Sequence, residues 1–120
     1  MSTVKKRKLS GSTDGAPIKV VATATAGTTI HTAIAGTTVG TFDEIWIYAQ
    51  NNHTSAVTLT IEYGGATAPD QNIITTLASK AGLQLIVPGL ILQNGLTVKA
   101  FASSANVICI SGFVNTITDA

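Results

Sequence analysis

The feature that most constrains the fold is a regular alternation of short strand-like segments with turn residues, at a spacing of roughly 8 to 12 residues. Residues 56–63 give the clearest example, because every second side chain there is apolar, which is the period of a half-buried β-strand. Its predicted inward side chains are Val57, Leu59, Ile61 and Tyr63, and its predicted outward side chains are Thr58, Thr60 and Glu62. No segment carries a sustained apolar stripe with the 3.6-residue period of a helix. The sequence therefore predicts an all-β protein.

About eight such strands favour a single antiparallel β-sandwich with a jelly-roll-like topology. Segment 43–50 carries large side chains on both faces, so we expect it to be a central strand, and we expect it to form a hairpin with 56–63. The turn pairs Pro88-Gly89 and Asn94-Gly95 separate later strands. The predicted strands are 18–24, 28–35, 43–50, 56–63, 72–77, 83–87, 96–102 and 106–114.

Residues 1–16 differ from the rest of the chain in charge, and we predict a flexible basic N-terminal arm there, followed by a β-sandwich domain over residues 17–120. The arm carries a formal charge of +3, whereas the domain carries −2. The positive charges of the arm form one run, Lys5, Lys6, Arg7 and Lys8. A run of this kind is either a solvated tail or a segment that docks on an acidic surface of another subunit, and the residues leave both interpretations open. Because the arm holds almost no core-forming side chains, we expect the domain to fold without it.

The low charge of the chain bears on its partners. Only 11% of the residues are charged, against about 25% in ordinary soluble domains, so we expect part of the surface to be covered in a homo-oligomer. The basic run has no interleaved aromatic residues and predicts no specific nucleic-acid binding. No apolar stretch follows it, and no apolar run is long enough to cross a bilayer, so we expect synthesis in a cytoplasm and no membrane partner.

Few residues could carry chemistry, and we predict no catalytic residue, no metal site and no cofactor. A zinc site needs three or four ligands at defined spacing, whereas the candidate ligands here are His31, His53 and Cys109. We expect structural roles for both histidines, and the apolar neighbours of Cys109 predict a small buried hydrophobe without thiolate reactivity. The adjacent carboxylates Asp43 and Glu44 should point to opposite faces of a strand, which predicts loop or edge solvation and not an acid–base pair.

The aromatic residues offer one candidate binding face. Trp46 and Tyr48 lie two residues apart, so they should share one face of a strand. Such a pair meets the minimum requirement of a glycan-binding surface, but we favour packing under a loop or against another subunit, because six aromatic residues barely suffice for a core.

Several segments together resemble small virion proteins of tailed bacteriophages. They are SGSTDGAPIKV at residues 10–20, DEIWIYA at 43–49, VTLTIEYGG at 57–65, AGL at 81–83 and VPGL at 87–90. The resemblance implies a head decoration (cement) protein, a non-enzymatic β-sandwich that binds the major capsid protein on the outer capsid surface as an oligomer, often a trimer. We therefore expect a virion component made in the host cytoplasm, in which the capsid is the docking surface open to the basic run. The alternative is a receptor- or glycan-binding module of a phage tail or head fibre that uses Trp46 and Tyr48.

Overall fold

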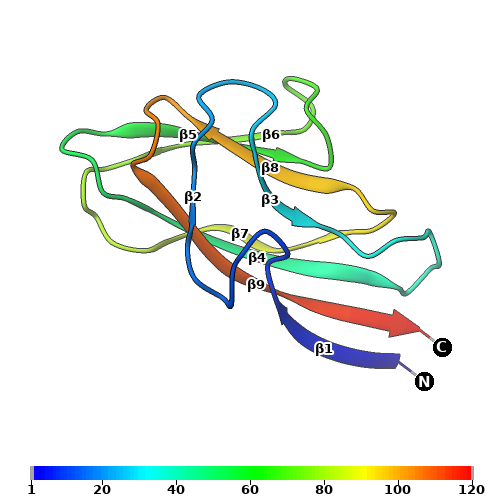
Figure 1. The fold of residues 1–120 in the computed structure, drawn as a ribbon. Helices are drawn as coiled ribbons and strands as arrows, with labels where there is room; N and C mark the ends of the chain where they lie inside the picture. The colour runs from blue at the N-terminus through cyan, green and yellow to red at the C-terminus, as the bar shows by residue number, and fades with distance from the viewer. Residues whose placement is uncertain (1, 120) are drawn as a thin grey trace.

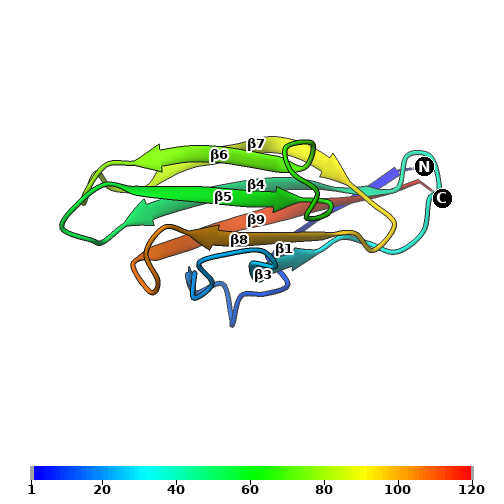
Figure 2. The same cartoon turned by 90° about the horizontal axis from the view of Figure 1, so that it is seen from above.

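Nine strands follow one another without an intervening helix in residues 2–119, the part of the chain that this computed structural model describes. They are β1 (Ser2–Lys8), β2 (Ile18–Lys19), β3 (Thr28–Thr32), β4 (Phe42–Asn51), β5 (Val57–Tyr63), β6 (Asn72–Leu77), β7 (Gln84–Leu92), β8 (Thr97–Ala102) and β9 (Ile108–Asp119). All pairings are antiparallel and build two facing sheets, and Figure 2 views them from above, with β3, β5, β6 and β8 in front of β1, β4, β7 and β9. Sheet A has the order β1-β9-β4-β7, with β2 also paired to β9, and sheet B has the order β3-β8-β5-β6. The predicted all-β sandwich is confirmed.

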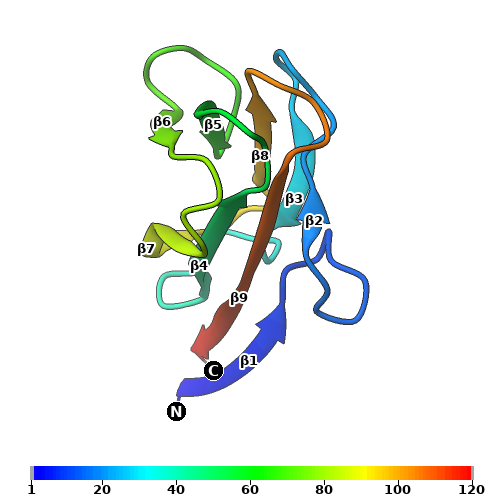
Figure 3. The same ribbon diagram turned by 90° about the vertical axis from the view of Figure 1, so that its left-hand side faces the viewer.

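The pairing order is that of a jelly roll. β1 and β2 pair with β9, β3 with β8, β4 with β7 and β5 with β6, so the first half of the chain runs beside the second half in reverse order. This long ribbon is rolled up, and the additional pairs β4–β9 and β5–β8 complete the two sheets. Figure 3 shows both sheets from one side, with β1 and β7 at opposite edges of sheet A.

The core lies between the sheets, where alternate side chains of each strand meet. β4 pairs with β9 on one side and with β7 on the other, so its predicted central position is confirmed. Ile45, Ile47 and Ala49 on its inner face are completely buried, while Trp46 and Tyr48 on its outer face are half-buried. The alternation in the sequence thus separates core from surface as expected for a sandwich.

The predicted hairpin of residues 43–50 with 56–63 is wrong, because β4 and β5 belong to different sheets. The segment between them crosses from sheet A to sheet B, and the buried side chain of Asn51 fixes the crossing. Its Nδ2 donates to the carbonyls of Ser55 and Leu77, each at 3.0 Å, and its Oδ1 accepts from the backbone N–H of His53 at 2.9 Å. Turn residues of this kind suit a hairpin and a crossing equally well.

The outer face of β5 is also more enclosed than predicted. Thr60 and Glu62 were expected to face solvent, yet both are buried. The strand predicted at 18–24 ends after Lys19, and residues 22–27 lie against β8 and β5 of sheet B instead. Glu62 accepts a 2.6 Å hydrogen bond from the backbone N–H of Gly27 and another from the hydroxyl of Thr25. Donors from the chain replace the water that a carboxylate otherwise needs.

The expectation of an arm free of core side chains is wrong. Residues 2–8 form β1, which pairs along its whole length with residues 113–119 of β9. The strand predicted at 106–114 therefore extends to Asp119, and its last part has β1 as a partner. Leu9, directly after β1, is 1% exposed and belongs to the core. The N-terminal segment is thus part of the sandwich, and Figure 1 shows the two chain ends side by side.

Candidate functional site: a buried histidine–aspartate pair beneath a basic strand

A pocket opens where β1 of sheet A and β3 of sheet B lie at the same side of the sandwich. Its volume is about 440 Å³, within the range of small-molecule sites. It is lined by Arg7, Lys8, Ser10, His31, Thr32, Ile34, Asp43 and Thr116. These residues come from four strands and two loops, so the pocket exists only in the folded chain.

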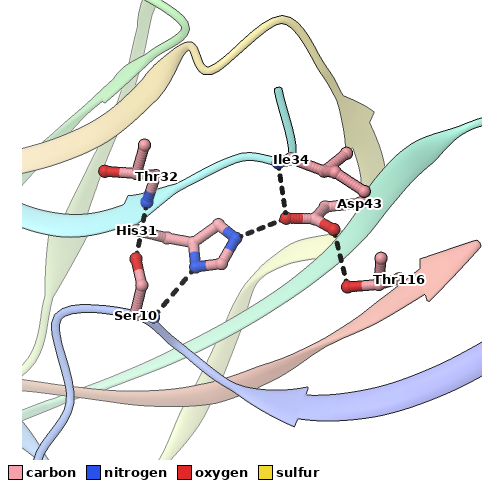
Figure 4. Close-up of polar contacts among 6 residues, drawn as sticks. All are labelled: Ser10, His31, Thr32, Ile34, Asp43 and Thr116. Atoms are coloured by element: carbon pink, nitrogen blue, oxygen red, sulfur yellow. Dashed lines mark hydrogen bonds and ion pairs between the residues drawn. The ribbon is translucent and has the colours of Figure 1, made fainter. Parts of the chain in front are cut away.

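Two of the lining residues, His31 and Asp43, form a buried pair at the base of the pocket, and Figure 4 shows their contacts. The Nε2 atom of His31 lies 2.7 Å from Oδ2 of Asp43, and both side chains are about nineteen-twentieths buried. A β-bulge in β3 between Thr29 and His31 allows Ile30 and His31, although consecutive, both to be buried. The prediction of loop or edge solvation for Asp43 is therefore wrong, because β3 supplies a histidine partner.

Hydrogen bonds satisfy the Asp43 carboxylate on both oxygens. Oδ2 accepts from His31 and from the backbone N–H of Ile34 at 3.2 Å, and Oδ1 accepts from the Thr116 hydroxyl at 2.8 Å. Three donors around one carboxylate compensate the cost of burying its charge. Asp43 thereby ties sheet A to β3 and to the loop that follows it.

The N-terminal segment fixes the state of His31. The backbone N–H of Ser10 donates to Nδ1 of His31 at 2.9 Å, and an N–H group can only donate. His31 is therefore the neutral tautomer whose proton is on Nε2 and points to Asp43. The Ser10 hydroxyl does not face the ring, because it accepts from the backbone N–H of Thr32 at 2.7 Å. Serine, histidine and aspartate thus lie together without the hydroxyl–imidazole contact that a nucleophilic triad requires.

The basic run is divided between the two faces of sheet A. Residues opposite each other in an antiparallel pair share a face, so Lys5 and Arg7 lie on the inner side with Thr116 and Val114. Lys8 at the strand end donates from Nζ to the Ser12 carbonyl at 2.9 Å. Among residues 2–119 no lysine or arginine lies within ion-pair distance of an aspartate or glutamate, so Arg7 has no carboxylate partner there. The four cations that the sequence groups together are therefore separate elements, of which Arg7 and Lys8 line the pocket.

The aromatic residues form a row across the outer face of sheet A. Lys6 on β1 lies over the Phe113 ring, with Nζ 4.3 Å from its centroid, and Phe113 stacks on Trp46 with centroids 6.0 Å apart. On the next strand, a Cβ added to Gly89 would lie 2.8 Å from Cζ2 of Trp46. Because β1 and β4 flank β9 on opposite sides, Lys6 and Trp46 occupy both faces of Phe113. Tyr48 follows on β4, opposite the exposed Leu85.

Glu44 stabilises the Trp46 end of this row by hydrogen bonds. Its Oε1 accepts from Nε1 of Trp46 at 2.8 Å and from Nδ2 of Asn115 at 3.0 Å. These two hydrogen bonds, that of Trp46 first, hold the pKa of Glu44 below its usual value. The adjacent carboxylates Asp43 and Glu44 thus point to opposite faces, as predicted from the strand period.

Other candidate residues have local contacts. Cys109 is half-buried, in contrast to its predicted burial, and its Sγ lies 3.9 Å from Nδ2 of Asn52. His53 lies in the crossing after β4. Residues 2–119 hold no group of three or more His, Cys, Asp or Glu side chains suited to a metal ion, and no helix in that range could span a membrane.

Sequence reasoning missed the pocket because no spacing in the chain brings His31 and Asp43 together. The contact depends on the bulge in β3 and on the consecutive strands β3 and β4 lying in facing sheets. The isolated leucine at position 9, between two polar segments, was the one signal that the N-terminus has an anchor. No protein-family model, curated protein or solved structure matches the chain.

Proposed function

We propose that this jelly roll is a non-enzymatic structural protein of a tailed-phage virion, which decorates and stabilises the capsid by binding its outer surface as an oligomer, and that the oligomer is a trimer. The resemblance of its segments to small virion proteins supports the family. The partner is the major capsid protein. The location is the capsid surface.

The observation that carries the proposal is an apolar surface beside β7. We call it the β7 patch, and it consists of Leu83, Leu85 and Ile91, each between 47% and 58% exposed. β7 is an edge strand without charged residues, and Trp46 and Tyr48 lie next to it on β4. Exposed apolar edges of this kind promote association, and interface cores are depleted in charge. We therefore assign the β7 patch to contact with a second copy of the chain.

The pocket supports a structural role over a hydrolytic one. Nδ1 of His31 accepts a hydrogen bond from the backbone N–H of Ser10, and the Ser10 hydroxyl accepts one from the backbone N–H of Thr32. The ring and the hydroxyl therefore do not form the base–nucleophile contact that a hydrolase needs. The His31–Asp43 pair instead joins β3, β4 and the segment that follows β1. This arrangement is that of a structural polar network.

The glycan-binding alternative receives no specific support from the aromatic row. A sugar ring packs on a free aromatic face, whereas Lys6 and Trp46 cover both faces of Phe113 and Gly89 contacts Trp46. Tyr48 remains as a single half-buried ring. The row is better suited to contact with a protein surface.

The direct test is the copy number of the protein on purified particles. Decoration predicts copies in proportion to the capsid subunits, because each lattice position offers the same site. A handful of copies per particle would place the protein in the tail or neck and overturn decoration. Saturable binding of sugars by the isolated protein, together with low copy number, would favour the receptor-binding alternative.

A further inference from the structure

We propose that the pocket between β1 and β3 binds the carboxylate side chain of an acidic extended segment from the partner protein, with Arg7 as its main contact. The identity of the partner rests on the proposed function, whereas the chemistry of the ligand rests on the pocket alone. The occupant is a peptide carboxylate, and free anions are alternatives for the test.

The first argument is the charge that faces the pocket from each element. β1 contributes Arg7 and Lys8, with Lys5 on the same inner side as Arg7. β3 contributes His31, which is neutral because Nδ1 accepts a hydrogen bond, and β9 contributes the neutral Thr116. β4 contributes Asp43, whose carboxylate lies at the base of the pocket and accepts hydrogen bonds from three donors. The pocket is therefore positive at its mouth, with a guanidinium that lacks an anion.

The second argument selects a carboxylate among anions. The guanidinium of Arg7 offers parallel N–H donors that match a carboxylate or a phosphate. Charge scales the attraction to Arg7 and the repulsion from Asp43 alike, but one guanidinium neutralises only one negative charge. The second charge of a phosphate dianion would stay unneutralised near the Asp43 carboxylate at the base of the pocket. A singly charged carboxylate is thus the better match to one free arginine above a buried aspartate.

The third argument concerns the shape of the occupant. β1 is the last strand of sheet A on its side, and its other edge has no partner among residues 2–119. An extended segment that adds to this edge gains main-chain hydrogen bonds, and alternate side chains fall on the inner side. A side chain beside Arg7 then enters the pocket. The exposed lysines of β1 disfavour pairing with another basic strand, which makes the edge selective for acidic segments.

The test uses the full chain and two synthetic octapeptides, one alternating Thr and Glu and one alternating Thr and Gln, measured by calorimetry at constant low ionic strength. We expect the Glu peptide to bind and the Gln peptide to bind at least about tenfold more weakly. Arg7→Gln should lower the affinity for the Glu peptide at least about tenfold, and Arg7→Lys should recover only part of it, because lysine lacks the fork of donors.

Lys19→Gln is the matched control, since it removes one exposed charge from β2 of the same sheet and should change the affinity less than about twofold. Equal losses for Arg7→Gln and Lys19→Gln would overturn the assignment to the pocket, as would equal binding of both peptides or no binding of the Glu peptide. Stronger competition by phosphate than by acetate would overturn the choice of a carboxylate, and an affinity for acetate equal to that for the Glu peptide would overturn the peptide source.

The proposed function fails independently of this inference. If wild-type protein does not attach to particles but binds the Glu peptide through Arg7, the capsid assignment fails and the carboxylate pocket stands. If wild-type and Arg7→Gln proteins attach equally to particles and bind the peptide equally, the pocket assignment fails and decoration stands.

Discussion

One edge of sheet A is β1, on which Lys5, Lys6, Arg7 and Lys8 are all exposed, and the other edge is β7, whose nine residues include no charge. An unpaired strand edge invites pairing with other chains, and proteins block it by charge or by irregular backbone. β1 uses charge. β7 is blocked by Pro88 and Gly89 together with two register shifts against β4, while its side chains carry no charge.

The two edges are therefore suited to different partners. Electrostatic repulsion keeps copies of β1 apart and attracts acidic segments, whereas the β7 patch gains free energy when it is removed from water. The irregular backbone of β7 prevents open-ended strand pairing and leaves side-chain packing as the mode of contact. Under the two proposals above, this domain associates with itself at the β7 edge and with an acidic segment of another protein at the β1 edge.

The largest expected effect is a loss of stability when Leu9, which anchors β1 to the core, is truncated. Leu9→Ala should cost about 2–5 kcal/mol of unfolding free energy, because Leu9 is 1% exposed in the core. Deletion of residues 1–12 should cost at least as much, since it also removes the pairing with β9. Urea denaturation measures both, with the exposed Val4→Ala as control. If Leu9→Ala is as stable as Val4→Ala, the N-terminal segment is a dispensable arm after all.

The next effect concerns β7 and the row across sheet A. Gly89 has a φ of 77° and approaches Trp46, so Gly89→Ala should cost about 1–3 kcal/mol in backbone strain and more through the contact with the ring. Gly82→Ala is the matched control, because Gly82 has a φ of 86° but no atom within 4 Å of an added Cβ. The difference in unfolding free energy reports the Trp46 contact alone. No difference would show that Gly89 serves only the backbone.

A smaller effect on stability is expected at high pH from Tyr63, which packs against the core. Burial, and secondly the charge of Asp43, raise the pKa of Tyr63 well above its usual 10, and its hydroxyl lacks a partner within residues 2–119. A raised folded pKa gives stability that is complete below pH 10 and is lost as the pH rises above it. Tyr63→Phe should remove this alkaline loss and be equal to or slightly more stable than wild type at pH 7. Tyr48→Phe should retain the alkaline loss; if it does not, the loss arises elsewhere.

The smallest expected effect is a difference in stability between substitutions on the two faces of β1. Lys6→Gln should cost about 0.5–1 kcal/mol through the lost contact with Phe113, whereas Lys5→Gln on the opposite face should cost less. The melting temperatures of the Lys6→Gln and Lys5→Gln variants at low and high salt measure this difference. Equal changes for both variants would show that the lysines act only through net charge.

The sequence predicts strands well where the signal is local. Residues 72–77 form β6 as expected, and β4, β5 and β8 lie within one residue of their predicted bounds, because alternation and turn residues are read over a few positions. It fails where stability comes from distant partners. β1 has the composition of a tail and becomes a strand because the long β9 offers it an edge.

The candidate site could be predicted from the sequence even less well than the strands. Lys5 to Lys8 form a visible cluster, but their division between two faces requires the register with β9. The His31–Asp43 contact requires a bulge that no residue in the sequence announces. The aromatic pair Trp46 and Tyr48 was placed on one face correctly, while Phe113, which completes the row, lies 67 positions after Trp46 and could be joined to it only through the pairing of β4 with β9.

The most direct test of the division between the two edges is sedimentation of three proteins at micromolar concentration. Wild type and Arg7→Gln should both sediment near three times 12.3 kDa, whereas the double variant Leu85→Asp with Ile91→Asp should sediment near 12.3 kDa and keep its fold by circular dichroism. A monomeric wild type would contradict the account, and so would an intact trimer in the β7 variant or its loss in Arg7→Gln.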